Sequence, residues 1–312
     1  MGHEYDNAFR TMEMDCPELL IPLVNEIFNT NYSLDSTIEL YPNEQMITSP
    51  EDEQMTRITD SNFAIIGPAK DRYHIECESN PDNDELQIRI FQYDMQVALY
   101  GRTFIDGVMH VSFPKTAILY LRHNSNTPDT LKISIHDGDN ELTREISVIK
   151  VQQFSLEEIF EKYLLIFLPF HIFLHEKKLS LYNEDKEKRQ ELIHEYEDII
   201  GKLNDLNQIG ELSSLEKYCI ITSMRNVLNL ITTNYAKVKK EIDKVMGGEL
   251  LEYEAKTIYR NGISKGIEKG RLEGELAKGL QAYKNCLDRG MSKEDALAIS
   301  GLKEEDIPNE LR

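Results

Sequence analysis

The chain has 312 residues, of which 40% are hydrophobic and 29% charged, so it can form a core in two domains or in one domain with a long appendage. It carries 55 acidic residues against 35 basic ones, a net charge of −20, and residues 1–100 alone carry 20 against 5. Such a surface repels the phosphate backbone of nucleic acids, which proteins bind chiefly through Lys and Arg, and this counts against DNA as a partner.

Neither a membrane span nor a targeting segment is expected, and we expect a cytoplasmic protein. The longest apolar run, Tyr163–Leu174, has twelve residues and contains Pro169, which is too short to cross a bilayer. The first ten residues, MGHEYDNAFR, are acidic where a signal peptide is basic and then apolar. Four cysteines without paired spacing predict neither a disulfide framework nor a zinc site: Cys16, Cys77, Cys219 and Cys286.

The first expected elements are a helix and three strands. Apolar residues recur every three or four positions in Pro17–Phe28, which predicts an amphipathic helix with a proline, Pro22, inside it. Thr37–Ile47, Thr56–Ile66 and Tyr73–Ser79 then have strand composition.

A second helix and further strands complete the first expected domain, residues 1–154. Ile88–Tyr100 has helical periodicity, and Lys115–Arg122 has the continuous apolar centre of a strand buried on both faces. Leu131–Ile135 and Glu145–Val151 flank a turn cluster, HDGDN, and predict a hairpin. This order predicts an α/β fold with a mixed sheet.

Residues 155–247 are expected to form an all-helical region. Ser155 with Glu158 has the spacing of a capping box and opens a helix that Pro169 must end or kink. Glu184–Leu206 and Leu212–Met246 predict long helices.

Residues 248–312 are expected to form a helical tail with glycines at strict intervals of four, Gly262, Gly266, Gly270 and Gly274. Each glycine destabilises a helix interior by about 1 kcal/mol relative to alanine. A glycine stripe allows close approach of a second helix, so we expect Glu249–Gln281 either to associate with the same segment of another copy, giving a homo-oligomer, or to stay mobile in a monomer. Asp288–Leu311 resembles two short helices around a turn.

The strand Tyr73–Ser79 carries the candidate site. With a period of two, His74, Glu76 and Glu78 share one face. If Gly67–Arg72 forms the loop of a hairpin, Asp60 and Glu76 can meet near its open end. Three carboxylates in one place repel one another, and a divalent cation is the usual way to stabilise them. The alternative interpretation is a solvated strand face.

Several motifs in order resemble the recombination-promoting nuclease/putative transposase family of the PD-(D/E)XK nuclease superfamily. The motifs are TDS at 59–61, YHIECES at 73–79, IRIFQYD at 88–94, YLR at 120–122 and LLIFLPFHI at 164–172. The resemblance covers about Tyr5–His175, and spaced glycines are also typical of such tails. It implies a restriction-endonuclease-like core over residues 1–154 and metal-dependent cleavage of DNA.

The resemblance also implies roles for particular residues. Asp60 and Glu76 correspond to catalytic metal ligands for Mg²⁺ or Mn²⁺, and Glu26 to a further acidic ligand on a helix. Glu78 stands where the family has Lys or Gln. An ionised Glu can only accept hydrogen bonds, so Glu78 serves as an added ligand or base, or marks a site without chemistry. The alternative function is therefore a catalytically silent relative that acts as a protein-interaction module.

Three more residues are candidates for substrate binding. Arg89 is suited to phosphate, and its alternative role is an ion pair with Asp94 or Glu85. His74 shares the face of Glu76, and its alternative role is a solvent-facing strand histidine. Gln96 forms a Q-x-x-x-Y spacing with Tyr100 on the expected second helix. His171 and His175 lie four apart without an indicated third ligand, and are read as packing or surface residues.

Overall fold

The computed structural model describes residues 3–41, 44–48, 54–58, 61–67, 70–79, 85–247, 278–287, 290–303 and 307. The chain divides into two compact units, Met1–Gly247 and Gly248–Arg312. The residues expected as a separate helical region, 155–247, therefore lie in the same unit as the sheet.

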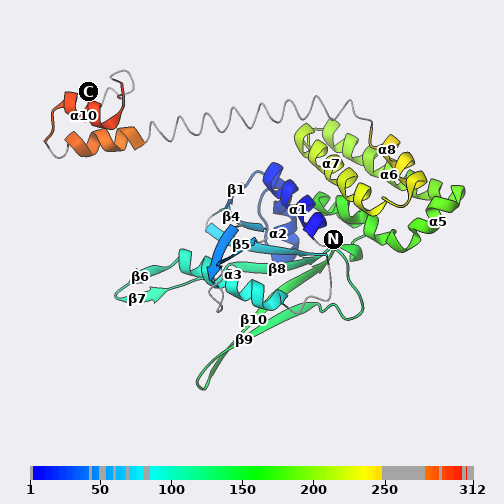
Figure 1. Cartoon of the computed structure of the whole chain (residues 1–312), viewed down its shortest axis with the longest axis horizontal. Helices are drawn as coiled ribbons and strands as arrows, with labels where there is room; N and C mark the ends of the chain where they lie inside the picture. Colours follow the sequence, from blue (N-terminus) through cyan, green and yellow to red (C-terminus); the bar gives the residue numbers. More distant parts are fainter. Residues whose placement is uncertain are drawn as a thin grey trace. The chain divides into compact units, whose positions relative to one another are not determined.

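The larger sheet of the first unit consists of β1 (Thr37–Leu40), β4 (Ser61–Ile66), β5 (Lys70–Glu78), β8 (Lys115–Tyr120), β9 (Thr130–Asp137) and β10 (Asn140–Lys150). Their order is β1–β4–β5–β8–β10–β9 (Figure 1). The pairs β1–β4, β4–β5 and β9–β10 are antiparallel, whereas β8 runs parallel to both β5 and β10. The expected α/β class with a mixed sheet is confirmed.

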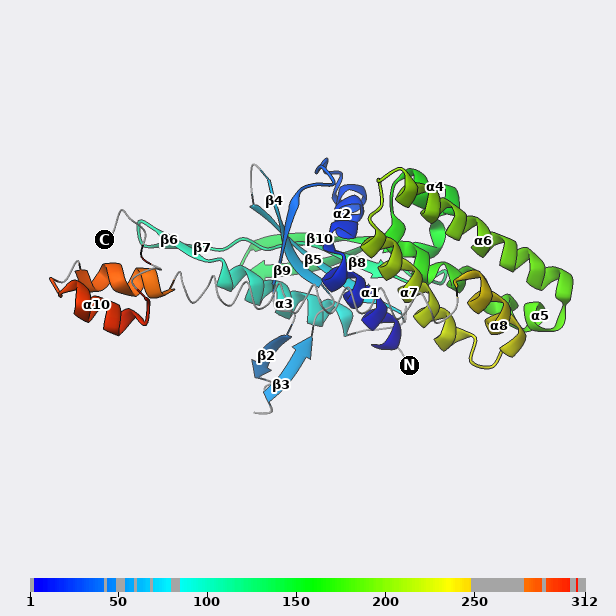
Figure 2. The same cartoon turned by 90° about the horizontal axis from the view of Figure 1, so that it is seen from above.

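Helices cover both faces of this sheet, because both faces of its central strands carry buried side chains. One face packs against α1 (His3–Asp15) and α2 (Leu20–Phe28), and the other against α3 (Leu86–Tyr100). α2 and α3 lie on opposite sides of the strands (Figure 2). On β8, for example, Leu119 belongs to the first apolar cluster, whereas Ile118 and Tyr120 belong to the second. The even-numbered residues of β5 and β8 therefore face α3.

The N-terminal helices differ from the expectation in one respect. The expected helix at 17–28 is present as a 3₁₀ turn, Pro17–Leu19, followed by α2, which includes Pro22. The preceding helix α1 was not predicted. It buries Ala8, Phe9 and Met12, which have helical spacing, on its inner face.

Two of the expected strands are each divided into two. The run Thr37–Ile47 yields β1 and β2 (Glu44–Thr48), and the run Thr56–Ile66 yields β3 (Gln54–Ile58) and β4. β2 and β3 pair with each other in a separate sheet. Pro42, which has no N–H for a ladder, lies between β1 and β2 in the sequence.

A short hairpin between α3 and β8 was also not predicted. It consists of β6 (Thr103–Ile105) and β7 (Val108–His110), joined by Asp106 and Gly107. Both turn residues have positive φ, 51° and 79°, as a two-residue type I′ turn requires. The expected hairpin at 131–151 is present as β9 and β10, and β8 has the expected burial on both faces.

The helical part of the first unit consists of α4 (Leu156–Glu161), the 3₁₀ segments η3 (Leu165–Leu174) and η4 (Glu176–Lys178), α5 (Leu179–Glu184), α6 (Lys186–Gln208), α7 (Ser214–Ile231) and α8 (Ala236–Val245). Ser155 and Glu158 form the expected capping box. Pro169 lies inside η3, a 3₁₀ rather than an α-helical segment. The expected single run to Met246 is broken after α7, where the hydroxyls of Thr232 and Thr233 bond to carbonyls of the preceding turn.

The second unit has a helical segment at 278–287 and α10 (Lys293–Ser300), joined through a turn at Gly290. Tyr283, Cys286, Ala296 and Ile307 form its apolar core. The four spaced glycines lie outside the described residues. Within the described ranges, no helix combines the length and apolar character of a membrane span.

Candidate functional site

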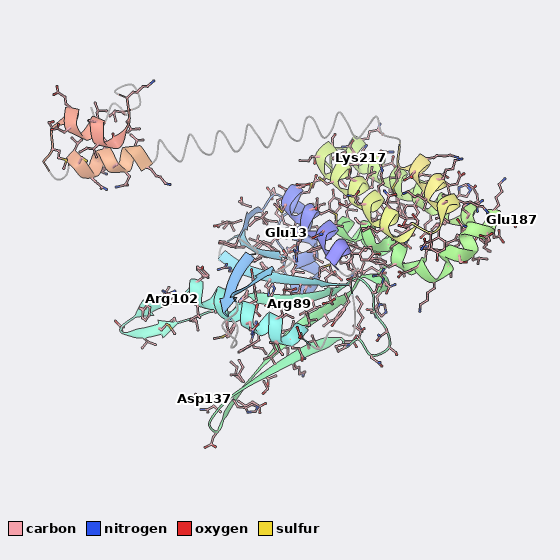
Figure 3. All side chains as sticks on the ribbon, viewed as in Figure 1. Glu13, Arg89, Arg102, Asp137, Glu187 and Lys217 are labelled. Atoms are coloured by element: carbon pink, nitrogen blue, oxygen red, sulfur yellow. The ribbon has the colours of Figure 1, made fainter. Side chains whose placement is uncertain are left out.

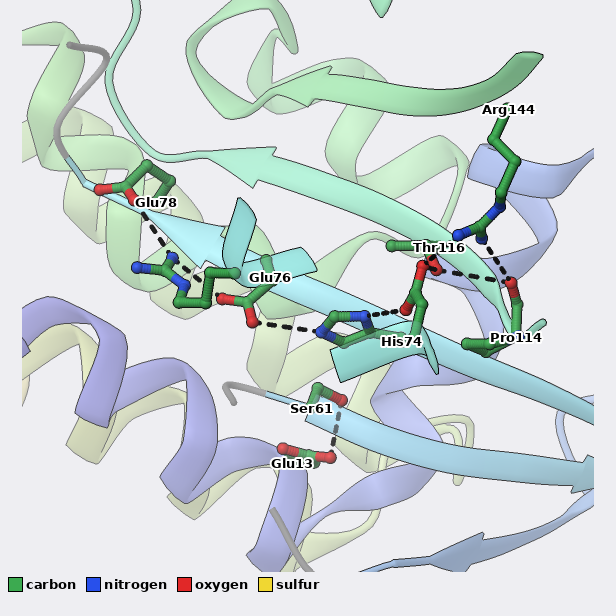
Figure 4. A network of polar contacts seen from close by, with 10 residues as sticks. Glu13, Ser61, His74, Glu76, Glu78, Pro114, Thr116 and Arg144 are labelled. Atoms are coloured by element: carbon green, nitrogen blue, oxygen red, sulfur yellow. Dashed lines mark hydrogen bonds and ion pairs between the residues drawn. The ribbon is translucent and has the colours of Figure 1, made fainter. Parts of the chain in front are cut away.

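The candidate site lies where β5 faces α3. Because β5 alternates, His74, Glu76 and Glu78 all point to this face, and in the register they stand beside Thr116, Ile118 and Tyr120 of β8. The three side chains are buried rather than solvated. Figure 4 shows the resulting network of polar contacts.

His74 is the centre of the network. Its Nδ1 lies 2.7 Å from Asp94 Oδ1, and its Nε2 lies 3.2 Å from Glu76 Oε1. Burial by itself would lower the pKa of His74, but the hydrogen bonds and charges of Asp94 and Glu76 outweigh it and raise the pKa to about 9. His74 is therefore an imidazolium at neutral pH and donates to both carboxylates.

Glu76 is held on both carboxylate oxygens. Oε1 accepts from His74, and Oε2 accepts from Nη2 of Arg89 at 3.1 Å. Burial opposes the charged form, but His74 and Arg89 outweigh it and lower the pKa of Glu76. The buried Glu76 is therefore an ionised carboxylate.

Arg89 bridges two carboxylates of β5 from the first turn of α3. The same Nη2 atom lies 3.4 Å from Oε2 of Glu78. The Arg89 side chain is 26% exposed, whereas Glu76 is almost fully enclosed. Arg89 thus places a positive charge between Glu76 and Glu78 and remains the member of this group that solvent reaches most readily.

Asp94 closes the other end of the network. Its Oδ2 accepts from Thr116 Oγ1 at 2.7 Å and from Arg144 Nη1 at 2.8 Å. Arg144 comes from β10, and its Nη2 also donates to the Pro114 carbonyl at 3.3 Å. The chain from Arg144 through Asp94 and His74 to Glu76, together with Thr116, therefore links β10, β5 and β8 to α3.

Formal charges in the network balance. Glu76, Glu78 and Asp94 provide three carboxylates, and Arg89, Arg144 and protonated His74 provide three positive charges. Buried charges are tolerated when each is paired and hydrogen-bonded, and every one of these groups has a partner. The large negative charge of residues 1–100 is therefore not concentrated in this network.

A separate buried acid lies on the other face of the sheet. Glu13 of α1 accepts a hydrogen bond from Ser61 Oγ at 2.6 Å, at the first residue of β4. Figure 3 labels Glu13 on α1 and Arg89 on α3. Ser61 pairs with Ile75 across the ladder, so Glu13 lies at the same end of the β4–β5 pair as Glu76.

The expected site residues are brought together only in part. Asp60 lies outside the described residues, whereas Glu76, Glu78, Arg89 and His74 form one cluster. Arg89 pairs with Glu76 and Glu78, which were not among its expected ion-pair partners. His74 is fully buried, so the alternative of a solvent-facing histidine is incorrect. Its expected role in substrate binding stays a prediction.

Glu26 and Gln96 are placed differently from this cluster. Glu26 on α2 forms an ion pair with Lys162 at 2.5 Å and is 29% exposed. Among the described side chains, no hydrogen bond or ion pair joins Glu26 or Gln96 to Glu76. Gln96 is half-buried on α3, and Tyr100, its partner in the expected spacing, is exposed.

Sequence reasoning missed four members of the two polar groups: Glu13, Asp94, Thr116 and Arg144. Asp94 was considered only as a partner for Arg89. Thr116 stands beside His74 in a parallel pair, and Arg144 reaches Asp94 from β10, so these contacts depend on strand order. Strand order cannot be read from local periodicity. For Glu13, the signal was an acid on the inner side of the unpredicted helix α1.

Comparison of the chain with protein-family models, curated proteins and solved structures found no match.

The donor set fits a hard divalent cation in its chemistry. Glu76 and Glu78 offer carboxylate oxygens, which Mg²⁺ and Mn²⁺ prefer, from alternate residues of one strand. A cation that used these oxygens would compete with Nη2 of Arg89, which already contacts both carboxylates. Arg89 is therefore the side chain that must move when such an ion binds.

Proposed function

We propose that the protein is a metal-dependent phosphodiester hydrolase that acts on DNA, with its site at the Asp60–Glu76 end of the β4–β5 pair. One observation carries the proposal. Ser61 is paired with Ile75, so the covalent neighbours of Asp60 and Glu76 face each other in the ladder. This is the register that the expected convergence of the two carboxylates needs.

The architecture supports the finer assignment of a PD-(D/E)XK core. A helical N-terminal segment precedes the antiparallel strands β1, β4 and β5, which are followed by α3 and by β8 parallel to β5. This order is compatible with the restriction-endonuclease-like core that the sequence resemblance implies. The motif residues Glu76 and Glu78 lie at the end of the central strand β5.

The side chains around Glu76 prepare it as a ligand. Asp60 and Glu76 would hold Mg²⁺ or Mn²⁺, which supplies Lewis-acid polarisation of the phosphodiester and lowers the pKa of an attacking water. His74 keeps Glu76 ionised and fixes the orientation of its carboxylate. Arg89 is partly exposed and, once released from the carboxylates, can donate to a phosphate oxygen.

Glu13 is a better candidate than Glu26 for the acid on a helix. Glu13 is buried and bonds to Ser61, the residue after Asp60. Glu26 is engaged at the surface by Lys162. The proposal therefore assigns the helix-borne acid to Glu13, which lies at the same end of the β4–β5 pair as Glu76 but on the opposite face of the sheet.

The second candidate function is a catalytically silent relative that serves as a protein-interaction module. Its supporting observation is that both oxygens of Glu76 already have positively charged partners, His74 and Arg89. Glu78 adds to this, because a carboxylate cannot donate a hydrogen bond to an attacking water. The excess of acidic residues in 1–100 also favours the silent relative, because it repels DNA.

Cleavage of supercoiled plasmid by the full-length protein tests the proposal. We expect nicking with Mg²⁺ or Mn²⁺, none with EDTA, and none with Asp60→Asn or Glu76→Gln. Glu145→Gln, which alters an exposed strand carboxylate, is the matched control and should cleave like the wild type. Several salt concentrations are needed, because added salt screens the repulsion between the acidic surface and DNA.

Glu78 decides between the two candidate functions. Glu78→Lys restores a donor beside the proposed nucleophile, so it should preserve or increase cleavage by an active enzyme. A wild type that is inert while Glu78→Lys cleaves would identify a silent nuclease relative. If neither cleaves DNA at any salt concentration, the hydrolase proposal fails.

A further inference from the structure

A second group of potential ligands lies in the helical part of the first unit, where no function has been assigned. His171 belongs to η3, His175 follows its last residue, and Glu195 comes from the middle of α6. One potential ligand atom from each of the three residues lies within 4.8 Å of those of the other two. A third ligand for the two histidines was not predicted, because Glu195 lies twenty residues beyond His175 in the chain.

The geometry of the three side chains is convergent. Nε2 of His171 lies 2.5 Å from Glu195 Oε1, and Nε2 of His175 lies 3.1 Å from Glu195 Oε2. The two imidazole rings are 5.5 Å apart between centroids and nearly edge to face. The Nε2 atoms of both histidines thus converge on the Glu195 carboxylate, and both lie within 3.3 Å of the same Oε1 atom.

The other ring nitrogens favour this orientation. Nδ1 of His175 lies 3.1 Å from the Tyr182 hydroxyl, which can fix the ring and leave Nε2 as the free ligand. Nδ1 of His171 is buried, with no hydrogen-bond partner in the described part of the chain. Nε2 is therefore the nitrogen that the fold presents to the cluster in both histidines.

The cluster is enclosed on one side and open on the other. The His171 side chain is 3% exposed, that of His175 15% and that of Glu195 28%. Three protein ligands with one accessible side match a tetrahedral ion whose fourth ligand is water. Two imidazoles and one carboxylate suit Zn²⁺ and similar transition-metal ions, whereas Mg²⁺ prefers oxygen ligands alone.

We propose that His171, His175 and Glu195 bind one transition-metal ion of the Zn²⁺ class, with water as the fourth ligand. The ion joins η3 to α6 and replaces direct hydrogen bonds between the histidines and Glu195. This site uses none of the residues of the proposed nuclease site, so the two proposals can fail independently.

Co²⁺ is the probe, because its visible absorption reports tetrahedral coordination. When EDTA-treated full-length protein is titrated, we expect the visible absorption of Co²⁺ to saturate at one ion per chain. Added Zn²⁺ should displace Co²⁺ and abolish this absorption. His171→Ala and Glu195→Gln each remove a ligand and should weaken binding by about tenfold or more. Glu76→Gln should leave it unchanged.

His194→Ala is the matched control. His194 lies on the same helix as Glu195, and its Nδ1 pairs with Glu197 at 2.9 Å. Both side chains of this pair are exposed, and the pair includes no second histidine. We expect wild-type Co²⁺ affinity for this variant. Circular dichroism of each variant without metal checks folding, and His175→Gln, at a less buried position, replaces His171→Ala if the latter does not fold.

Three results would overturn the proposal. The first is the absence of saturable Co²⁺ absorption in the wild type, which would identify the cluster as an ion pair only. The second is equal affinity in wild type, Glu195→Gln and the histidine variants. The third is an intense thiolate charge-transfer band, which would assign the ion to the hydrogen-bonded cysteines Cys16 and Cys219.

Discussion

Nη2 of Arg89 lies 3.1 Å from Oε2 of Glu76, and the same atom is 3.4 Å from Oε2 of Glu78. A positive charge between two carboxylates relieves their mutual repulsion, which is also what a bound divalent cation does. Arg89 therefore stabilises the two carboxylates and would compete with the proposed metal ion for the same oxygens. This relationship makes the response to metal depend on Arg89.

Arg89→Ala should lower the melting temperature in EDTA but increase the stabilisation by Mg²⁺ or Mn²⁺. The first effect follows because two buried carboxylates lose a partner, and the second because binding to the native state stabilises it by mass action. Melting curves with EDTA and with metal measure both. Arg122→Ala is the matched control, since Arg122 is 25% exposed and also pairs with a carboxylate, that of Glu176. An equal metal response in wild type and Arg89→Ala would refute the competition.

His74→Ala should destabilise the protein strongly. Its imidazolium contacts two buried carboxylates, and removal of one partner from a buried ion pair typically costs about 3–5 kcal/mol of unfolding free energy. Urea denaturation measures the change. Lys132→Ala, which breaks the exposed pair with Glu145, should change the free energy by about 1 kcal/mol or less. Similar small losses for both variants would show that the network contributes little.

The stability of the wild type should fall between pH 6.5 and about 9. His74 has its pKa raised from 6.5 to about 9 on folding, through Asp94 and Glu76. The stabilisation is therefore complete below pH 6.5 and is lost as pH rises through 9, by an amount on the order of 3 kcal/mol. Urea midpoints across this range test the slope. His74→Gln lacks the titrating group and should have a flatter profile; if its slope equals that of the wild type, another group is responsible.

If the tail self-associates, its deletion should convert an oligomer into a monomer. If the tail is mobile, the full-length chain should already be a monomer. We expect Glu249–Gln281 to self-associate, or to be mobile in a monomer, because glycines at intervals of four weaken an isolated helix by about 1 kcal/mol each. Light scattering of the full-length chain and of a chain ending at Gly247, the end of the first compact unit, distinguishes the first outcome. Equal monomeric mass together with slow amide exchange throughout the tail would contradict both.

Local periodicity predicted much of the fold because the elements have strong patterns. α3 corresponds to a run with helical spacing, β8 to a continuous apolar run, and the hairpin β9–β10 to two runs that flank a turn cluster. The division of Thr56–Ile66 between two sheets was not predicted, because a strand that changes its pairing partner keeps the same alternation of side chains. The hairpin β6–β7 was predictable from Asp106–Gly107, a dipeptide that is typical of type I′ turns.

The candidate site was predictable along β5 but not across the sheet. Glu76, Glu78 and His74 share a face through alternation alone. Asp94 and Arg144 joined them because α3 packs on that face and β10 lies next to β8. The same limitation hid Glu195 as the third residue beside His171 and His175. Residues distant in sequence became neighbours only through tertiary packing.

Binding of Mn²⁺ to the full-length protein, followed by electron paramagnetic resonance, tests most directly whether Asp60 and Glu76 form a divalent-cation site. His171→Ala should be measured in parallel, so that the cluster in the helical part is not counted. We predict that wild type and His171→Ala bind a Mn²⁺ ion that Asp60→Asn and Glu76→Gln do not bind. Mn²⁺ that stays free with the wild type, or binds equally to all four proteins, would contradict the account.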